Sequence, residues 1–241
     1  MWTYLLVNLA SLAGPFALSF DRRVRYVQYW PALLPAILLT GLVFIPWDAA
    51  FTAMGVWGFT PAYVMGIYPA GLPVEEWMFF VTIPYACLFV YECVNAYLRR
   101  DLAPRLAQGI ASGLGFILLL LALLLRDRWY PAVTCTLAGL LLIANGLWIK
   151  PVWLGRFLVA YLICLIPFLI VNGVLTALPV VWYNDAENTG LRIGTIPAED
   201  TMYGLLLILM NIQWYEWLKR RMRLKPYAPA PAAQPATAAH A

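Results

Sequence analysis

The stretch Pro73-Val74-Glu75-Glu76-Trp77-Met78-Phe79 opens a long apolar run, and Pro197-Ala198-Glu199-Asp200-Thr201-Met202-Tyr203 repeats it 124 residues later. Each run ends in a matching pair, Tyr91-Glu92 and Tyr215-Glu216. The constant spacing, which continues through these pairs without a gap, indicates a duplicated unit. Each copy places two acidic side chains at the start of a hydrophobic helix. Carboxyl groups beside hydrocarbon are energetically costly, so they usually have a function.

The composition is that of an integral membrane protein. Of 241 residues, 63% are hydrophobic and 12% charged, and the mean hydropathy is +0.75. A soluble domain averages about 45–50% apolar and about 25% charged residues. The net charge of +4 comes from basic residues gathered at segment ends and in the tail. This pattern indicates membrane topology and argues against a nucleic-acid partner.

Seven apolar stretches are close to the length of about 20 residues that crosses a bilayer. They are residues 2–20, 29–47, 77–97, 107–125, 130–149, 156–178 and 200–218. Basic residues follow the first, third, fifth and seventh stretches, and acidic residues gather in most of the other connections. The positive-inside rule therefore predicts an N-terminus outside and a cytoplasmic C-terminus, in the cell's inner or plasma membrane.

The predicted fold class is all-α, with seven transmembrane helices. Spans one to three correspond to spans five to seven, so the fourth span restores the direction of insertion. We expect parallel three-helix repeats at residues 1–100 and 129–224, joined by a spacer helix at 101–128 and related by a pseudo-two-fold axis along the membrane normal. The Pro- and Ala-rich tail, 225–241, is expected to be disordered and cytoplasmic.

The paired acids are the main candidates for chemistry. Acidic residues near a helix start are stabilised by the helix dipole, so Glu75, Glu76, Glu199 and Asp200 could simply cap their helices. Adjacent helical positions point about 100° apart, however, so one acid of each pair can face the bundle and the other the loop. A carboxylic acid in an apolar pocket can stay protonated near neutral pH and act as a general acid.

Two polar residues extend this candidate site. Asp48 ends the second span, and Asn172 occupies the matching place in the second copy. Both could reach the acids that begin the next span and hold a proton in place. Glu92 and Glu216 lie about 25 Å further along their helices, near the basic ends, where we expect a structural role. The long aromatic and glycine-rich loops before the acids suit a lid over an apolar cavity.

The sequence offers no sign of a metal or cofactor site. Cys87, Cys93, Cys135 and Cys164 all lie inside apolar spans without metal-type spacing, which favours buried small hydrophobic residues. The only histidine, His240, lies in the tail. No G-x-G-x-x-G fingerprint follows a predicted strand.

At this point the pattern resembles a known family. The span ended by Asp48, the Trp-containing loop and Pro-Val-Glu-Glu-Trp-Met-Phe-Phe, repeated with Asn172 and Pro197-Ala198-Glu199-Asp200, resemble the small membrane lycopene cyclases. That family occurs as two subunits, as one fused chain, or joined to phytoene synthase. Over residues 1–222 this chain is similar to the fused form. The second copy departs from the pattern, with Gly204 in place of Phe80 and Asn172 in place of Asp48.

The resemblance implies a lycopene β-cyclase, an isomerase that needs no cofactor. Its substrates within the bilayer would be lycopene and γ-carotene, and its product β-carotene. An acid protonates the terminal double bond, the C5–C6 double bond attacks the cation, and a base removes the C6 proton. Glu75 and Glu199 are the first candidates for the donor, followed by Glu76 and Asp200, with Asp48 and Asn172 as orienting partners. We expect Trp57, Phe79, Trp182 and Tyr203 to bind the substrate and stabilise cations.

Other functions remain open at this stage. Relatives that cyclise C50 carotenoids or hydrate carotenoid ends would use the same cation. A retinal protein needs a lysine in mid-membrane, but Lys150, Lys219 and Lys225 all lie at span ends. A transporter would be expected to hold ionisable groups nearer mid-span. The sequence does not reveal the oligomeric state or whether both copies are active.

Overall fold

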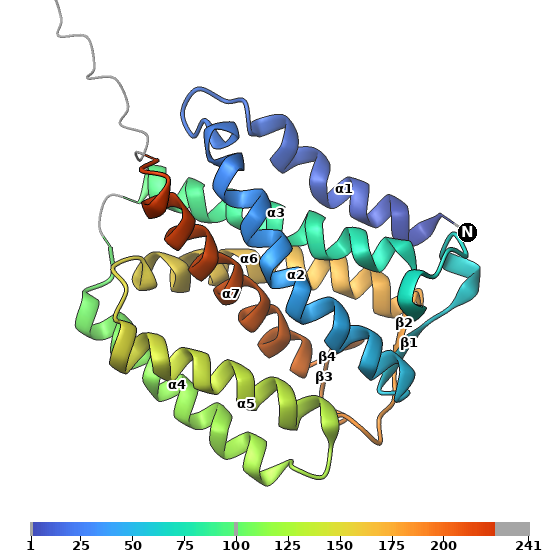
Figure 1. Ribbon diagram of the computed structural model, residues 1–241. Coiled ribbons are helices and arrows are strands. Elements are labelled where there is room, and N and C mark those ends of the chain that lie inside the picture. Colours follow the sequence, from blue (N-terminus) through green and yellow to red (C-terminus); the bar gives the residue numbers. More distant parts are fainter. Residues whose placement is uncertain (1, 99–100, 225–241) are drawn as a thin grey trace, which may run out of the picture.

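The computed structural model describes residues 2–98 and 101–224, so the predicted tail lies outside the described residues. Within this part, seven long helices follow one another in the order that the hydropathy pattern predicts (Figure 1). Their bounds are α1 Thr3–Leu18, α2 Trp30–Ala53, α3 Val74–Tyr97, α4 Pro104–Leu124, α5 Trp129–Ile143, α6 Leu154–Ala177 and α7 Glu199–Arg221.

Five of the described helical segments are long and apolar enough to cross a membrane: Tyr26–Ala53, Val74–Tyr97, Pro104–Leu124, Trp129–Ile149 and Leu154–Ala177. The sixth, α1, is apolar but has only 16 residues. The seventh, α7, carries acids at its start and Lys219, Arg220 and Arg221 in its last turn. The molecule is therefore a polytopic helical membrane protein.

Two helices differ at their ends from the predicted spans. The second span was expected to end at Asp48, but α2 continues to Ala53 and places Asp48 inside the helix. The end of the fifth span, Ala144–Ile149, forms a π-helical turn that closes at Lys150 in the left-handed region. Short 3-10 turns, Tyr26–Tyr29, Pro61–Tyr63 and Pro69–Gly71, complete the helical structure.

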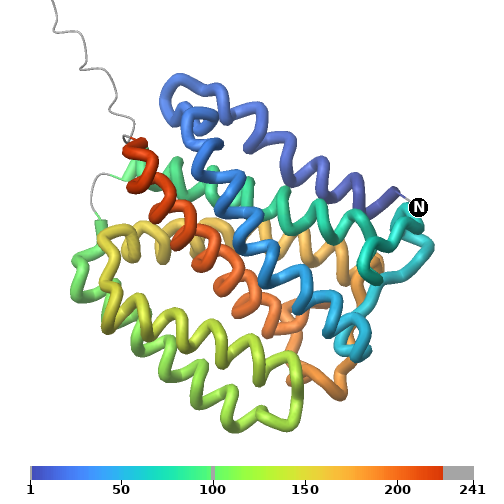
Figure 2. The backbone as a smooth tube through the Cα atoms, viewed as in Figure 1, coloured from blue at the N-terminus to red at the C-terminus, as the bar shows by residue number. Residues whose placement is uncertain are grey.

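The helices pack in corresponding pairs. In the views of Figures 1 and 2, α1 lies along α3, α2 runs beside α7, and α4 and α5 form a hairpin at one side. The pair α5 and α7 in the second copy corresponds to α1 and α3 in the first. The pair α6 and α3 corresponds to α2 and α7. The hairpin of α4 and α5 is close because Gly115 and Gly139 face each other. A Cβ added at Gly115 would lie 2.8 Å from the Gly139 carbonyl oxygen.

A small strand pair joins two loops at one end of the bundle. Strand β1, Trp57–Phe59, pairs antiparallel with β2, Val181–Tyr183. Gly58 pairs with Trp182, which lies 124 positions later, and Trp57 and Phe59 pair with Tyr183 and Val181. A second pair, β3 Arg192–Ile193 and β4 Ile196–Pro197, shapes the loop before α7.

Residues 124 positions apart also exchange partners at the opposite end of the bundle. The Tyr91 hydroxyl donates to Glu216 Oε1 at 2.9 Å, and the Tyr215 hydroxyl donates to Glu92 Oε1 at 2.9 Å. The buried ammonium of Lys219 bridges Glu92 and Glu216, with N–O distances of 2.7 and 3.3 Å. This end thus has the structural contacts expected for Glu92 and Glu216.

The first helix departs from the 124-residue spacing. Helix α1 begins at Thr3 and α5 at Trp129, an offset of 126, whereas α2 and α6 begin and end 124 positions apart. Tyr4 and Tyr130, 126 positions apart, confirm the larger offset. The Tyr4 hydroxyl donates to Glu76 at the start of α3, and the Tyr130 hydroxyl donates to Asp200 at the start of α7. From the start of its first helix to the start of its second, the first copy is therefore two residues longer than the second copy.

Candidate active site

The two acids of each pair point in different directions, as the 100° step along a helix predicts. In the first copy, Glu75 turns back to the loop, where its Oε1 accepts a hydrogen bond from the Met65 N–H at 2.7 Å. Glu76 instead lines an apolar cavity between the helices. The Glu75 backbone carbonyl also accepts from the Asn8 side chain at 3.1 Å, which ties α3 to α1.

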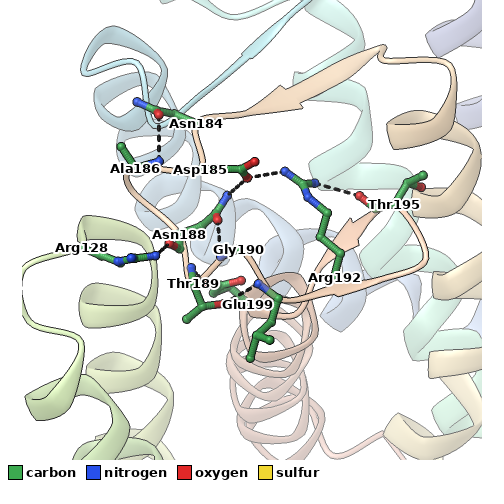
Figure 3. Close-up of polar contacts among 11 residues, drawn as sticks. Arg128, Asn184, Asp185, Ala186, Asn188, Thr189, Gly190, Arg192, Thr195 and Glu199 are labelled. Carbon is green, nitrogen blue, oxygen red and sulfur yellow. Dashed lines mark hydrogen bonds and ion pairs between the residues drawn. The ribbon is translucent and has the colours of Figure 1, made fainter.

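The second copy repeats this arrangement. Glu199 Oε1 accepts from the Thr189 N–H at 2.5 Å, and Thr189 lies 124 positions after Met65 (Figure 3). The next residue in each loop, Gly66 or Gly190, has a positive φ of 82° or 73° that favours glycine. Asp200 lines the same cavity as Glu76. Glu75 and Glu199 therefore each hold a loop turn against a helix start.

The loop before α7 is further fixed by an exposed ion pair. Arg192 Nη2 lies 2.5 Å from Asp185 Oδ1, and the Asn188 amide donates to the same oxygen at 3.1 Å (Figure 3). These two hydrogen bonds, led by the one from Asn188, lower the pKa of Asp185. The Arg128 guanidinium donates to the Asn188 carbonyl oxygen and so connects the loop to the start of α5.

Glu76 meets a second carboxyl group at the cavity. The Tyr4 hydroxyl from α1 donates to Glu76 Oε2, and the buried carboxyl of Asp48, from α2, lies close enough to interact with Glu76. Asp48 Oδ1 accepts from the Trp57 indole N–H at 2.5 Å. Its other oxygen, Oδ2, is buried and has no hydrogen-bond partner among the described residues.

Asp200 has a different environment. The hydroxyls of Tyr130 and Tyr183 donate to its two oxygens at 2.5 and 2.8 Å. Burial, and then the neighbouring Asp200, raise the pKa of Tyr183, so its phenol stays protonated and able to donate. In the first copy the place of Tyr183 is taken by Phe59, which stacks on Tyr4 but cannot donate.

These acids converge on one cavity of about 640 Å³. This volume lies within the range of small-molecule sites, about 300–1,000 Å³. Asp48, Glu76, Asp200 and Asn172 all line it, so both copies contribute. Glu75 and Glu199 are not among its lining residues; the Oε2 atom of each is buried and has no hydrogen-bond partner in the described part of the chain.

Three of the four predicted substrate-binding aromatics, Trp57, Phe79 and Tyr203, line the cavity. Trp57 and Tyr203 are neighbours, with ring centroids 6.0 Å apart. Trp182 does not line it. Its ring lies over Gly58 on the strand pair, where a Cβ on Gly58 would come within 2.4 Å of the Trp182 ring.

The polar end of the cavity has acids but no paired cation. Within residues 2–98 and 101–224, none of Asp48, Glu76 and Asp200 forms an ion pair. A buried carboxyl without a counter-charge is more easily accommodated when it carries its proton. The arrangement can therefore deliver a proton to an apolar molecule beside aromatic faces.

Sequence reasoning missed Tyr4, Tyr130 and Tyr183 as partners of the acids. Tyr4 lies 72 residues from Glu76, and Tyr130 lies 70 residues from Asp200. Only an offset of 126 for the first helix, instead of 124, would have aligned the two tyrosines and exposed the repeat of this contact.

Comparison with known proteins identifies the family of this chain. The family model described as lycopene cyclase matches residues 1–94 and 127–218, most of the chain. Over 122 residues the chain is 26% identical to the bifunctional lycopene cyclase/phytoene synthase of Podospora anserina. That match covers 47% of this chain and 20% of the fungal protein, and no solved structure matches. Because the family model matches well over half of the chain, the chain belongs to the lycopene cyclase family.

Proposed function

We propose that this protein is a lycopene β-cyclase that closes the ψ ends of lycopene to β-ionone rings, through γ-carotene to β-carotene. The observation that supports this most directly is the convergence of Asp48, Glu76 and Asp200, from three different helices, on one apolar cavity. The cavity accommodates hydrocarbon, and the acids supply the proton that starts a non-redox cyclisation.

The proposed reaction has three steps. A proton adds to C2 of the terminal C1–C2 double bond and leaves a tertiary cation at C1. The C5–C6 double bond attacks C1, so that the C1–C6 bond forms and the charge moves to C5. Loss of the C6 proton restores the C5–C6 double bond. One proton enters and one leaves for each ring, so the reaction is an isomerisation and needs no oxidant.

We assign the donor role to Glu76 with Asp48. Two neighbouring carboxyl groups in an apolar site cannot both ionise without a large cost, so the pair favours holding one proton between them. The Tyr4 and Trp57 donors occupy one oxygen of each acid and fix their orientation. Glu75 and Glu199 are the first candidates for the donor from sequence, and that role stays a prediction. Their carboxylates contact the Met65 and Thr189 N–H groups of the loops.

We assign the acceptor role to Asp200. It receives hydrogen bonds from two phenols, whereas Glu76 receives one. Hydrogen bonds to an ionised acceptor are stronger than neutral ones, so two donors favour the carboxylate form of Asp200 relative to Glu76. The rings of Trp57, Phe79 and Tyr203 would stabilise the cation between these steps by cation–π contact.

The two copies are proposed to be parallel repeats around a pseudo-two-fold axis. Gly58 and Trp182, which pair between strands β1 and β2, lie 124 positions apart. This pairing and the reciprocal tyrosine–glutamate hydrogen bonds at the other end support the arrangement.

The positive-inside rule then puts the acids on the outer side of the membrane. A single pocket reaches only one end of lycopene, which is about as long as the bilayer core is thick. Each molecule must therefore be released as γ-carotene and bound again.

The test is expression in lycopene-accumulating cells, followed by pigment chromatography. The matched variants are Glu76→Gln and Glu75→Gln, with membrane levels compared by immunoblot. We expect Glu76→Gln to abolish ring formation. Glu75→Gln should retain much of it, because the glutamine carbonyl can still accept from the Met65 N–H. The unmodified chain in isolated membranes in D₂O should place one deuterium on each new ring, with γ-carotene appearing first.

Three outcomes would overturn parts of this proposal. Unchanged lycopene with a normally inserted chain would exclude the cyclase. Full activity in Glu76→Gln with loss in Glu75→Gln would return the donor role to Glu75. Hydroxylated or C50 products instead of β-carotene would place the chain with the hydratases or C50 cyclases.

A further inference from the structure

The cavity continues well beyond the acids. Along α1 its lining runs from Tyr4 to Leu18, which corresponds to about 21 Å at the helical rise of 1.5 Å per residue. Beyond Tyr4 and Val7, this side includes the small residues Ala10, Ser11 and Gly14. The acids lie at the N-terminal end of α1, because Tyr4 donates to Glu76 there. The remaining length is a nearly apolar channel.

This channel opens sideways between α1 and α6. Ala10, Gly14 and Leu18 line it and are exposed on the molecular surface, and they follow one another at four-residue spacing along one edge of α1. On α6, Ile170 and Val174 both line the cavity and are exposed, by 64% and 39%. The opening therefore faces the apolar outer surface of these helices, where lipid would lie.

The other half of the molecule lacks the same small residues. At the offset of 126, Ser11 and Gly14 on α1 correspond to Leu137 and Leu140 on α5. On α2, Phe44 and Trp47 stand 124 positions before Phe168 and Val171 of α6. The rings of Phe44 and Trp47 pack on Tyr203, with their centroids 5.2 and 5.0 Å from the Tyr203 centroid. Leucines thus stand where α1 has Ser11 and Gly14, and the Trp47 ring stands where α6 has Val171.

We propose that a linear polyene enters sideways from the bilayer between α1 and α6, and that its unreacted portion lies along the Ala10–Gly14–Leu18 edge while one end reaches the acids. This inference rests on the proposed function. The apolar lining fits a hydrocarbon chain, and Asp48, Glu76 and Asp200, at the Tyr4 end of the cavity, mark the reactive end. A length of about 21 Å holds most, but not all, of a molecule about 30 Å long.

The test is Gly14→Leu, the residue that the second half carries at this place. Nothing lies within 4 Å of a Cβ built on Gly14, so the variant should fold and fill the channel. Gly113→Leu on α4 is the matched control, because its Cβ also meets open space and it does not line the cavity. Ile170→Trp narrows the opening from the opposite side.

Each variant is assayed in isolated membranes with lycopene and with a truncated polyene that keeps one ψ end and about a third of the chain. We expect Gly14→Leu and Ile170→Trp to lower the rate on lycopene by about tenfold or more, from steric exclusion of the longer chain. The truncated polyene should react with Gly14→Leu within about twofold of the unmodified rate. A third of the chain spans about 10 Å and ends short of Gly14, which lies about 15 Å from Tyr4 at the helical rise. Gly113→Leu should match the unmodified protein on both substrates.

Lycopene turnover by Gly14→Leu at the unmodified rate would overturn the channel assignment while leaving the cyclase in place. Equal loss on both substrates would also overturn it, since the defect would then not depend on chain length. A lipid acyl chain as the occupant would give unchanged turnover with a lowered unfolding temperature. An unmodified chain that converts neither substrate overturns the proposed function and this inference together.

Discussion

Replacing Lys219 by methionine should destabilise the protein without altering its chemistry. The Lys219 ammonium is buried between Glu92 and Glu216, at 2.7 and 3.3 Å. It also lies over the rings of Tyr29 and Tyr215, 4.6 and 4.8 Å from their centroids. Methionine keeps the apolar stem but removes the only charge that compensates the two carboxylates in the described structure.

The expected cost follows from what the substitution leaves behind. Removing one partner of a buried ion pair costs about 3–5 kcal/mol, because the remaining charge is uncompensated. Here two carboxyl groups lose their counter-charge, and their side chains are only 5% and 15% exposed. For a chain of this size, about 3 kcal/mol lowers the unfolding midpoint by about 6–12 °C.

The assay is thermal unfolding in detergent micelles, with pigment turnover per folded molecule measured separately. Lys150→Met is the control, because Lys150 is exposed and outside this cluster. Adding Glu92→Gln to Lys219→Met should recover part of the lost stability, since one uncompensated charge is removed. A single variant as stable as the unmodified protein would refute the reasoning. So would a double variant less stable than the single one.

Two further substitutions test the loop contact and the acid. Gly58→Ala should lower the free energy of unfolding by about 1–3 kcal/mol from overpacking, because its Cβ would lie 2.4 Å from the Trp182 ring. Thermal unfolding measures this, with Gly109→Ala as the control, since a Cβ on Gly109 meets open space. Equal unfolding midpoints for the two variants would contradict the contact. Tyr183→Phe removes one of two donors to Asp200, each worth about 1.5–3 kcal/mol to a charged acceptor, so ring formation should fall about 10- to 100-fold. Tyr68→Phe, exposed and outside the cavity lining, is the control for turnover, and activity unchanged in Tyr183→Phe would remove that phenol from the mechanism.

Much of the architecture was accessible from local sequence. Hydropathy and charge predicted a membrane protein with seven helices, and the helices begin and end within a few residues of the predicted spans apart from the longer α2. The 124-residue repeat predicted that both copies start a helix with two acids. Such features depend on neighbouring residues, whose hydrophobicity and helical step are readable without the fold.

Only the tertiary structure decided how the acids divide their contacts. Sequence ranked Glu75 above Glu76 because Pro-x-Glu is the identical part of the repeat, yet the helix phase turns Glu75 to the Met65 N–H and Glu76 to the cavity. Asp48 was expected to reach the acids of the next span, and the packing of α2 beside α3 brings it to Glu76. Pairing with tyrosines some 70 residues away, and the single channel beside α1, depend on helix packing, which hydropathy and spacing do not encode.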